Sequence, residues 1–331
     1  MWLFFASLTA FFEACKDATG KHSLKRLDEY SVLFGFMAVG VVLLLPVLWL
    51  TGGIPPLLPN FWLALSIGGS LNILAFTLYV RALKIADLSL TVPLVTLTPL
   101  FLLGTSPLIV QEWPTWADAV GVLLLVVGSY VLNLPTPVPA SAQAEASSPS
   151  TLFTAGTLFA AGSQRPVASS RRSLFLAPLA AMVRNPGSRL MLCVAFIWSI
   201  TSNFDKIGVV NSSPLFWAIA LFSVIALGMV PFVFLPFVVS KNHRKFKGNP
   251  IEPLRANWRI LGITGGFNAI AITFQMLALT LAPVAQVIAV KRMSALLSVL
   301  FGHFFFGEKG LKSRLVGAAV MVSGVVIMSL Q

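Results

Sequence analysis

The sequence predicts an all-α polytopic membrane protein, with ten transmembrane helices arranged as two inverted five-helix repeats around a central cavity. Of its 331 residues, 57% are apolar and only 10% are charged, whereas an ordinary globular domain carries about 25% charged residues. Apolar runs recur from one end of the chain to the other, and the second half repeats the first. This composition excludes a soluble enzyme, a single membrane anchor and a mostly disordered chain.

A transmembrane helix needs about 20 mostly apolar residues, and the sequence offers ten such runs. They cover residues 2–19, 31–50, 61–81, 88–110, 115–134, 190–210, 214–240, 257–279, 284–306 and 311–330. The first run has no basic region before it and no small-residue cleavage site, so we interpret it as a span rather than a signal peptide.

Residues 135–189, between the fifth and sixth runs, are rich in Pro, Ala, Ser and Thr, which predicts a linker. Within it, 174–187 has the pattern of an amphipathic helix on the membrane surface. We therefore expect a first five-helix repeat over 1–134, the linker over 135–189 and a second five-helix repeat over 190–331.

The two halves align without gaps over a long stretch. A shift of 196 residues superposes 62–132 on 258–328, with 16 identities in 71 positions. Earlier segments match at other shifts, Lys16 on Lys206 (190) and Pro46 on Pro231 (185). The identities include polar residues and glycines that apolar bias alone would rarely align: Asn72 with Asn268, Thr77 with Thr273, Glu112 with Glu308, Gly69 with Gly265, Gly121 with Gly317 and Gly128 with Gly324. The paired glycines of the last span in each half predict close helix packing.

Five is an odd number of spans, so the second repeat must enter the membrane in the opposite direction. The charges agree, because twenty of the 23 Lys and Arg residues fall in the odd-numbered loops or at the span ends beside them, where Lys16 is counted with the first loop. Lys206 is the exception on the other side, and Lys291 and Arg292 lie inside the ninth span. The positive-inside rule then puts the odd loops in the cytoplasm and both termini outside a cell (inner) membrane. The net charge of +12 therefore indicates topology, and we expect a lipid bilayer and no nucleic acid as partner.

The end of each half resembles the EamA family of the drug/metabolite transporter superfamily. Residues 82–134 and 278–330 both show an Ala-Leu before a short loop, an apolar span ending at a Glu, and G-x6-G in the next span. The resemblance covers nearly all of the chain except 135–189, and it implies a ten-helix bundle around a central cavity with alternating access. Relatives of this kind are generally placed with both termini in the cytoplasm, whereas the loop charges here predict the reverse.

A shorter stretch, VIAVKRMSALLSVLFGHFFF at 287–306, resembles the corresponding segment of plastid phosphate-sugar translocators. Those transporters carry a Lys-Arg pair there that binds the substrate phosphate, and another phosphate-binding Lys at the position of Lys206. The resemblance thus implies an anion-binding role for Lys291, Arg292 and Lys206.

The positions of these cations support the same role independently. Lys291 and Arg292 lie about a third of the way into span nine, where each is unfavourable by ~2.5–3.5 kcal/mol unless it faces a wet cavity or an anion. We expect them to bind substrate together with Lys206. The alternatives are snorkelling to the interface, or structural ion pairs with Asp205 or Glu13.

Polar residues also recur at equivalent places in spans three and eight. Asn72 and Tyr79 share one helix face, and Asn268 and Gln275 repeat their spacing. They are expected either to line the cavity and bind substrate or to join helices through hydrogen bonds.

Four carboxylates complete the set of candidates. Glu13 and Asp205 are predicted to carry a proton or to act as charge partners of the cations. Glu112 and Glu308, at span ends, are predicted to be interface or cap residues. Three prolines, Pro93, Pro99 and Pro107, are expected to kink span four.

These features predict a secondary transporter that moves a small polar metabolite, with an anionic group as the expected point of recognition, by alternating access. The sequence shows no nucleotide-binding, metal-binding or catalytic motif, so we expect no cofactor, no metal and no enzyme activity. One alternative is the same fold exporting a neutral or zwitterionic solute such as an amino acid or drug. Another is a non-transporting membrane protein, and a homodimer stays open.

Overall fold

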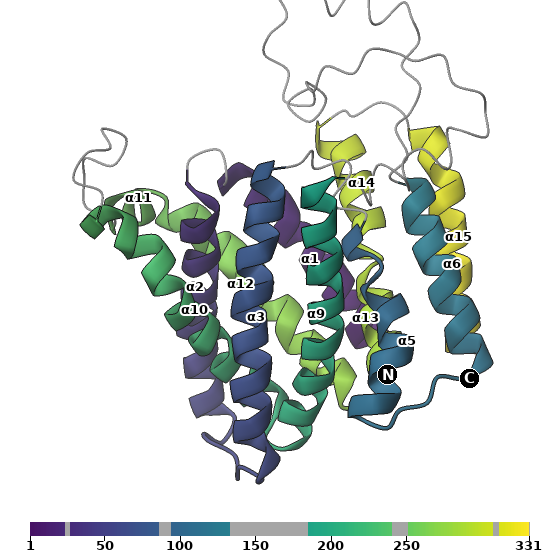
Figure 1. Ribbon diagram of the computed structural model, residues 1–331, viewed down its shortest axis with the longest axis horizontal. Helices are drawn as coiled ribbons and strands as arrows, with labels where there is room; N and C mark the ends of the chain where they lie inside the picture. Colours follow the sequence, from purple (N-terminus) through teal and green to yellow (C-terminus); the bar gives the residue numbers. More distant parts are fainter. Residues whose placement is uncertain (24–26, 86–93, 133–184, 240–250, 307–310, 331) are drawn as a thin grey trace, which may run out of the picture.

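The computed structural model describes residues 1–23, 27–85, 94–132, 185–239, 251–306 and 311–330, and the regular elements in these ranges are all α-helices (Figure 1). Most of the predicted linker, the predicted surface helix up to residue 184 and Glu308 lie outside the described residues.

A helix lies within every predicted span, although spans four and nine are interrupted. The helices of the first half are α1 (Trp2–Ser23), α2 (Glu29–Leu50), α3 (Asn60–Ile85), α5 (Thr98–Ile109) and α6 (Trp116–Leu132). Those of the second half are α9 (Pro186–Val210), α10 (Pro214–Val239), α11 (Ile251–Ala256), α12 (Trp258–Leu279), α13 (Val284–Lys291), α14 (Ser294–Phe306) and α15 (Leu311–Ser329). By length and composition, α2, α3, α9, α10 and α12 can each cross a membrane.

Local sequence sets the helix ends, as α2 illustrates. The Asp28 carboxylate accepts a hydrogen bond from the Ser31 backbone N–H at 2.8 Å, which caps the first turn. The helix ends before Gly52 and Gly53, whose φ angles of 114° and 78° suit glycine. The capped end and the glycine end together confine the helix to one apolar run.

The two halves pack as an inverted pair. Helix α1 packs mainly on α12 and α9 mainly on α3, while α2 meets α10 and α6 meets α15. The Leu58 N–H donates to the Asn211 carbonyl at 3.0 Å, so the α2–α3 connection lies beside the α9–α10 connection. Because these are the second turn of one repeat and the first turn of the other, the second repeat runs in the opposite direction. Both termini lie toward the lower ends of the helices in Figure 1, and α11 lies near their upper ends.

Glycines at equivalent positions set the contacts between the halves. A Cβ on Gly69 in α3 would lie 2.6 Å from Val224 in α10, and one on Gly265 in α12 would lie 2.7 Å from Val39 in α2. Val39 and Val224 are themselves related by the shift of 185 residues seen in the sequence. The same close approach is therefore made twice, once by each repeat.

The crossing of α6 and α15 is tighter still. A Cβ on Gly128 would lie 2.7 Å from the Gly317 carbonyl, and one on Gly324 would lie 2.6 Å from the Gly121 carbonyl. These helices therefore meet backbone to backbone, which confirms the close packing predicted from the glycine spacing.

The outer surface is apolar. Large exposed side chains include Trp49, Leu50, Leu108, Trp116 and Trp258, far more than a soluble monomer presents. The core between the halves holds Trp217, Phe61 and Phe222, each at most 1% exposed. An apolar outside with polar groups buried inside is the arrangement that a bilayer requires.

We predict that Gly128→Ala destabilises the protein by about 1–3 kcal/mol, because a methyl group there overpacks the α6–α15 crossing. The matched control is Gly262→Ala in α12, where a Cβ meets nothing within 4 Å. Alanine is the better helix former, so the control should melt at or above the wild-type temperature. Thermal unfolding in detergent measures both, and equal melting temperatures would contradict the packing described here.

Candidate functional site

Span nine is broken inside the apolar bundle, contrary to the continuous helix predicted over 284–306. Helix α13 ends before a turn at Arg292 and Met293, after which α14 begins. In this turn the Arg292 N–H donates a hydrogen bond to the Ala289 carbonyl at 3.0 Å, and the Met293 N–H donates one to the Val290 carbonyl at 2.9 Å. These short-range bonds tighten the helix into a 3₁₀-type turn and interrupt its regular ladder. Such breaks at membrane depth occur where the backbone faces protein or a wet cavity.

Span four is broken at the equivalent place. A turn at Thr96 and Leu97 precedes α5, and the Leu97 N–H bonds the Leu94 carbonyl at 3.1 Å. The shift of 196 residues maps this turn onto the turn in span nine. Pro99 lies in the first turn of α5, which favours a helix start there. The two breaks are therefore a property of the repeat.

The two breaks touch each other. One terminal nitrogen of the Arg292 guanidinium donates to the Thr98 hydroxyl at 3.0 Å, and α13 packs on α5. The Arg292 Nε is buried and has no hydrogen-bond partner among the described residues. The guanidinium thus spans the junction of the two repeats with part of its donor capacity unused.

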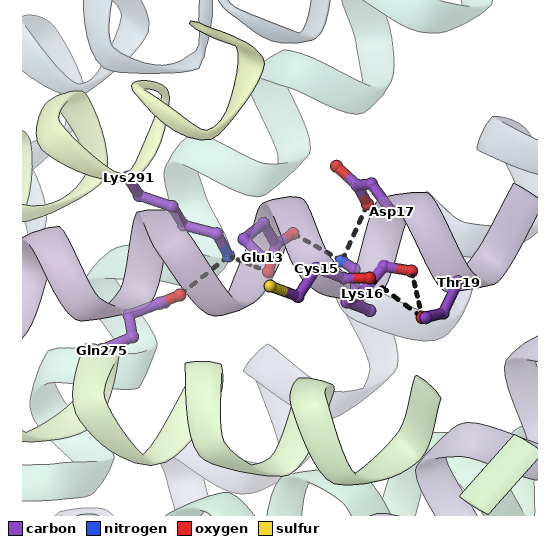
Figure 2. A network of polar contacts seen from close by, with 7 residues as sticks. All are labelled: Glu13, Cys15, Lys16, Asp17, Thr19, Gln275 and Lys291. Carbon is purple, nitrogen blue, oxygen red and sulfur yellow. Dashed lines mark hydrogen bonds and ion pairs between the residues drawn. The ribbon is translucent and has the colours of Figure 1, made fainter. Parts of the chain in front are cut away.

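Lys291 stands at the end of α13 and reaches toward two other helices (Figure 2). Its ammonium donates to the Gln275 side-chain oxygen in α12 at 2.8 Å and lies 3.9 Å from Glu13 Oε2 in α1. The Lys291 and Glu13 side chains are 16% and 14% exposed, so water screens this pair only in part. The predicted structural partner Glu13 is therefore near Lys291, although the shorter contact is to a neutral amide.

Helix α1 contributes a second cation to the same network. The Lys16 ammonium donates to Glu13 Oε1 at 2.5 Å and lies 3.5 Å from Asp17 (Figure 2). Assigning Lys16 to the first loop was wrong, since it lies within α1 and pairs inside the bundle. The network thus joins Glu13 and Asp17 to Lys16 and Lys291, and Arg292 follows Lys291 in the chain.

The paired amides are placed differently from each other. Asn72 is buried, and its side-chain nitrogen donates to the Gly68 carbonyl of its own helix at 3.0 Å. Asn268 is 3% exposed, and its side-chain nitrogen has no partner among the described residues. Gln275, the repeat equivalent of Tyr79, accepts from Lys291. The second repeat therefore supplies one amide whose nitrogen is unpaired among the described residues, Asn268, and one that accepts from a charged group, Gln275.

Tyr79 packs its ring against Trp198 of α9, with centroids 5.5 Å apart. The charges of Asp17, Lys16, Glu13 and Arg292 act on its hydroxyl, so it borders the same network. The structure thus brings Tyr79, Gln275, Glu13, Lys291 and Arg292 to one region.

Lys206 lies elsewhere. Its ammonium forms an ion pair with Glu112 Oε1 at 2.6 Å and donates to the Ala282 carbonyl at 2.8 Å. Glu112 Oε2 in turn accepts from the backbone N–H of Val284, the first residue of α13. Lys291 is at the other end of this helix, seven residues or roughly 10 Å along its axis. In this conformation Lys206 therefore joins α9, the end of span four and the start of α13, away from the other two cations.

Asp205 does not pair with its neighbour Lys206 in the described structure. One of its oxygens accepts from the Trp217 indole N–H at 3.1 Å, which joins α9 to α10. Its charge also acts on Lys291. Asp205 is thus a buried carboxylate at the edge of the network.

A small surface pocket of about 300 Å³ lies at the end of α2, lined by Leu48, Trp49, Gly53 and Ile54. None of the predicted site residues lines it. The candidate site is therefore defined by the buried polar groups at the two breaks.

Sequence reasoning missed Thr98, Asp17 and the role of Lys16 in the network. Lys16 gave a signal, because it aligns with Lys206 and lies three residues from Glu13 on one helix face. Thr98 gave none, since its contact with Arg292 depends on how the two repeats cross.

Comparison with known proteins identifies the family of this chain. The model of the EamA-like transporter family matches residues 1–134 and 185–330. A search of curated proteins found no match. A solved structure described only as a crystal structure of a protein superposes with a TM-score of 0.63 at 15% identity, over 99% of this chain and 95% of the other. At this identity the likeness shows the fold alone.

We predict a coupled effect of the Glu112–Lys206 contact on stability. Glu112→Gln and Lys206→Met each leave a partly buried charge without its partner and should cost about 1.5–3 kcal/mol. The double variant should lose less than the sum, because it strands no charge. Thermal unfolding of the four proteins measures the coupling, and strictly additive losses would show that the pair does not join these helices.

Proposed function

Since this chain belongs to the EamA-like transporter family, and is therefore a membrane transporter of the drug/metabolite type, we propose that it is a secondary transporter of a small anionic metabolite. The observation that carries this proposal is Arg292. It lies at a helix break, and none of the described residues forms an ion pair with it. A guanidinium that is partly buried within a membrane protein needs a compensating charge, and a bound anion supplies one.

The surroundings of Arg292 suit a ligand with an anionic group. The described ion pairs join Lys16 to Glu13 and Asp17 and bring Lys291 near Glu13, whereas no described carboxylate pairs with Arg292. The planar guanidinium offers an anionic group Nε and a terminal nitrogen in parallel, the geometry that grips a carboxylate or phosphate.

The proposed binding set is Lys291 and Arg292, with Gln275 and Asn268 as hydrogen-bonding neighbours. Tyr79, which packs on Trp198, borders it. Asn72 donates to the Gly68 carbonyl of its own helix, and we propose that it contributes to binding only in another conformation. Glu13 and Asp205 act as charge partners. Lys206, held by Glu112 and the Ala282 carbonyl, is not part of the proposed binding set in this conformation.

Alternating access follows from the inverted repeats. Two halves of opposite direction can exchange conformations, which exposes a site between them first to one side and then to the other. The site lies where the repeats meet, at the contact between Arg292 and Thr98. The sequence shows no nucleotide-binding motif, so we propose that an ion gradient or exchange drives transport.

A zwitterion such as an amino acid is the second candidate. Glu13 Oε2 is buried without a hydrogen-bond partner among the described residues. It could accept from an ammonium group while Arg292 holds a carboxylate. The two candidates share the anionic end and differ in whether Glu13 contacts the ligand.

Ligand binding can be tested by thermal shift, since a ligand that binds only the native state raises its stability by RT ln(1 + [L]/Kd). Inorganic phosphate, glycerol phosphate and succinate test the anion, glutamate and glutamine test the amino acid, and glucose and choline are controls without an anionic group. We predict stabilisation by the anions or by the amino acids, and Lys291→Gln should weaken it by about one to two orders of magnitude. Arg292→Lys should weaken it less, because the charge is kept but the planar fork is lost.

Two outcomes would contradict this assignment. Stabilisation by glucose or choline alone would remove the anion from the proposal. A collapse in the melting temperature of Lys291→Gln that Glu13→Gln restores would make Lys291 and Glu13 a structural pair.

We also propose that the odd-numbered connections face the cytoplasm and that both termini lie outside. The loop charges support this orientation. Both termini also lie toward the same ends of the helices, the lower ends in Figure 1. A reporter active only in the cytoplasm should work when inserted within 241–250 and be silent when fused after residue 331. The opposite pattern would reverse the orientation and leave the fold unchanged.

A further inference from the structure

The Glu13 carboxylate is shared unequally between two cations (Figure 2). Its Oε1 is held by Lys16 at 2.5 Å. Its Oε2 lies 3.9 Å from Lys291, and no described residue hydrogen-bonds to that oxygen. Lys291 instead donates a short hydrogen bond to the neutral side chain of Gln275. Glu13 therefore lies close to Lys291 without a hydrogen bond to it.

Among the described residues, few other charges act on Lys291. Besides Glu13 from α1, they are Lys16 from α1, Arg292 at the adjacent turn and Asp205 from α9. Of the two carboxylates among them, Asp205 is engaged by the Trp217 indole. Glu13 is thus the carboxylate free to approach Lys291.

A bound anion and Glu13 would compete for the same ammonium. With an anion at Arg292 and Lys291, the positive charge of Lys291 is satisfied and Glu13 can remain with Lys16. Without an anion, Lys291 is a partly buried cation, 16% exposed, whose uncompensated charge is unfavourable in a low-dielectric interior. A movement of about 1 Å would bring the Glu13 oxygen into hydrogen-bond contact with it.

We propose that Glu13 is the internal counter-ion that replaces the transported anion on Lys291 when the site is empty, and that it thereby lets the empty transporter change its orientation. The inference rests on the proposed function. It assigns Glu13 a role in the return step, as distinct from substrate contact, and it makes Glu13 the residue that decides between net transport and obligatory exchange.

The test compares net flux with exchange in proteoliposomes, using radiolabelled inorganic phosphate, succinate and glutamate, each by itself. Exchange needs only the loaded transporter to reorient, whereas net flux also needs the empty one. In Glu13→Gln, net flux should fall at least tenfold relative to exchange. The concentration for half-maximal exchange should also fall severalfold, because the internal competitor is gone.

Asp17→Asn is the matched control. It removes the same charge from the same helix, and its contact is with Lys16 at 3.5 Å rather than with Lys291. Because Asp17 belongs to the same charged network, both rates can change together in this variant, but the ratio of net flux to exchange should stay at the wild-type value. Should Glu13→Gln fail to fold, Glu13→Asp keeps the charge but draws the carboxylate back, and it should lower the ratio in the same direction to a smaller extent.

The remaining outcomes overturn the inference or its premise. Equal losses of net flux and exchange in the Glu13 variants would give Glu13 a structural role or a contact with substrate. An unchanged ratio would remove it from the return step, and the same shift in Asp17→Asn would mean that any carboxylate of α1 suffices. If wild-type protein moves none of the three probes in either mode, the proposed function fails, and the inference fails with it.

Discussion

Every charged group inside this bundle must find a partner, because the surrounding membrane supplies neither water nor counter-ions. Lys16 is neutralised by Glu13 and Asp17, and Lys206 by Glu112. Arg292 has no carboxylate partner among the described residues. It donates to the Thr98 hydroxyl, and its buried Nε has no hydrogen-bond partner among them. That imbalance, located at the contact between two helix breaks, is the constraint from which the function is inferred.

The scaffold is symmetric and the chemistry is not. Breaks in spans four and nine, glycine contacts and helix pairings all recur in both repeats. At the equivalent positions, however, Lys291 replaces Val95, Arg292 replaces Thr96 and Gln275 replaces Tyr79, while Asn203 stands in the second repeat where the first has Glu13. Symmetric backbones allow two conformations of similar energy, and the unequal side chains concentrate the charge at one ligand site.

The apolar runs and glycine spacing predicted the helices, the repeat and the α6–α15 contact, because period and composition are local signals. The break in span nine was not predicted, since neither Pro nor Gly occurs near Arg292 to announce it. The pairing of Lys206 with Glu112 was also missed, because these residues lie 94 positions apart and meet only through packing. The predicted neighbour Asp205 points elsewhere, as adjacent helix residues diverge by about 100°.

The central claim is that Arg292 recognises the anionic group of a transported solute. It is tested most directly by uptake of labelled anionic, zwitterionic and neutral solutes into proteoliposomes containing wild-type protein or Arg292→Gln. The account predicts saturable wild-type uptake of solutes with an anionic group, and its loss in a variant that still folds. Wild-type uptake confined to neutral solutes, or an Arg292→Gln variant that transports anions as well as wild type, would contradict it.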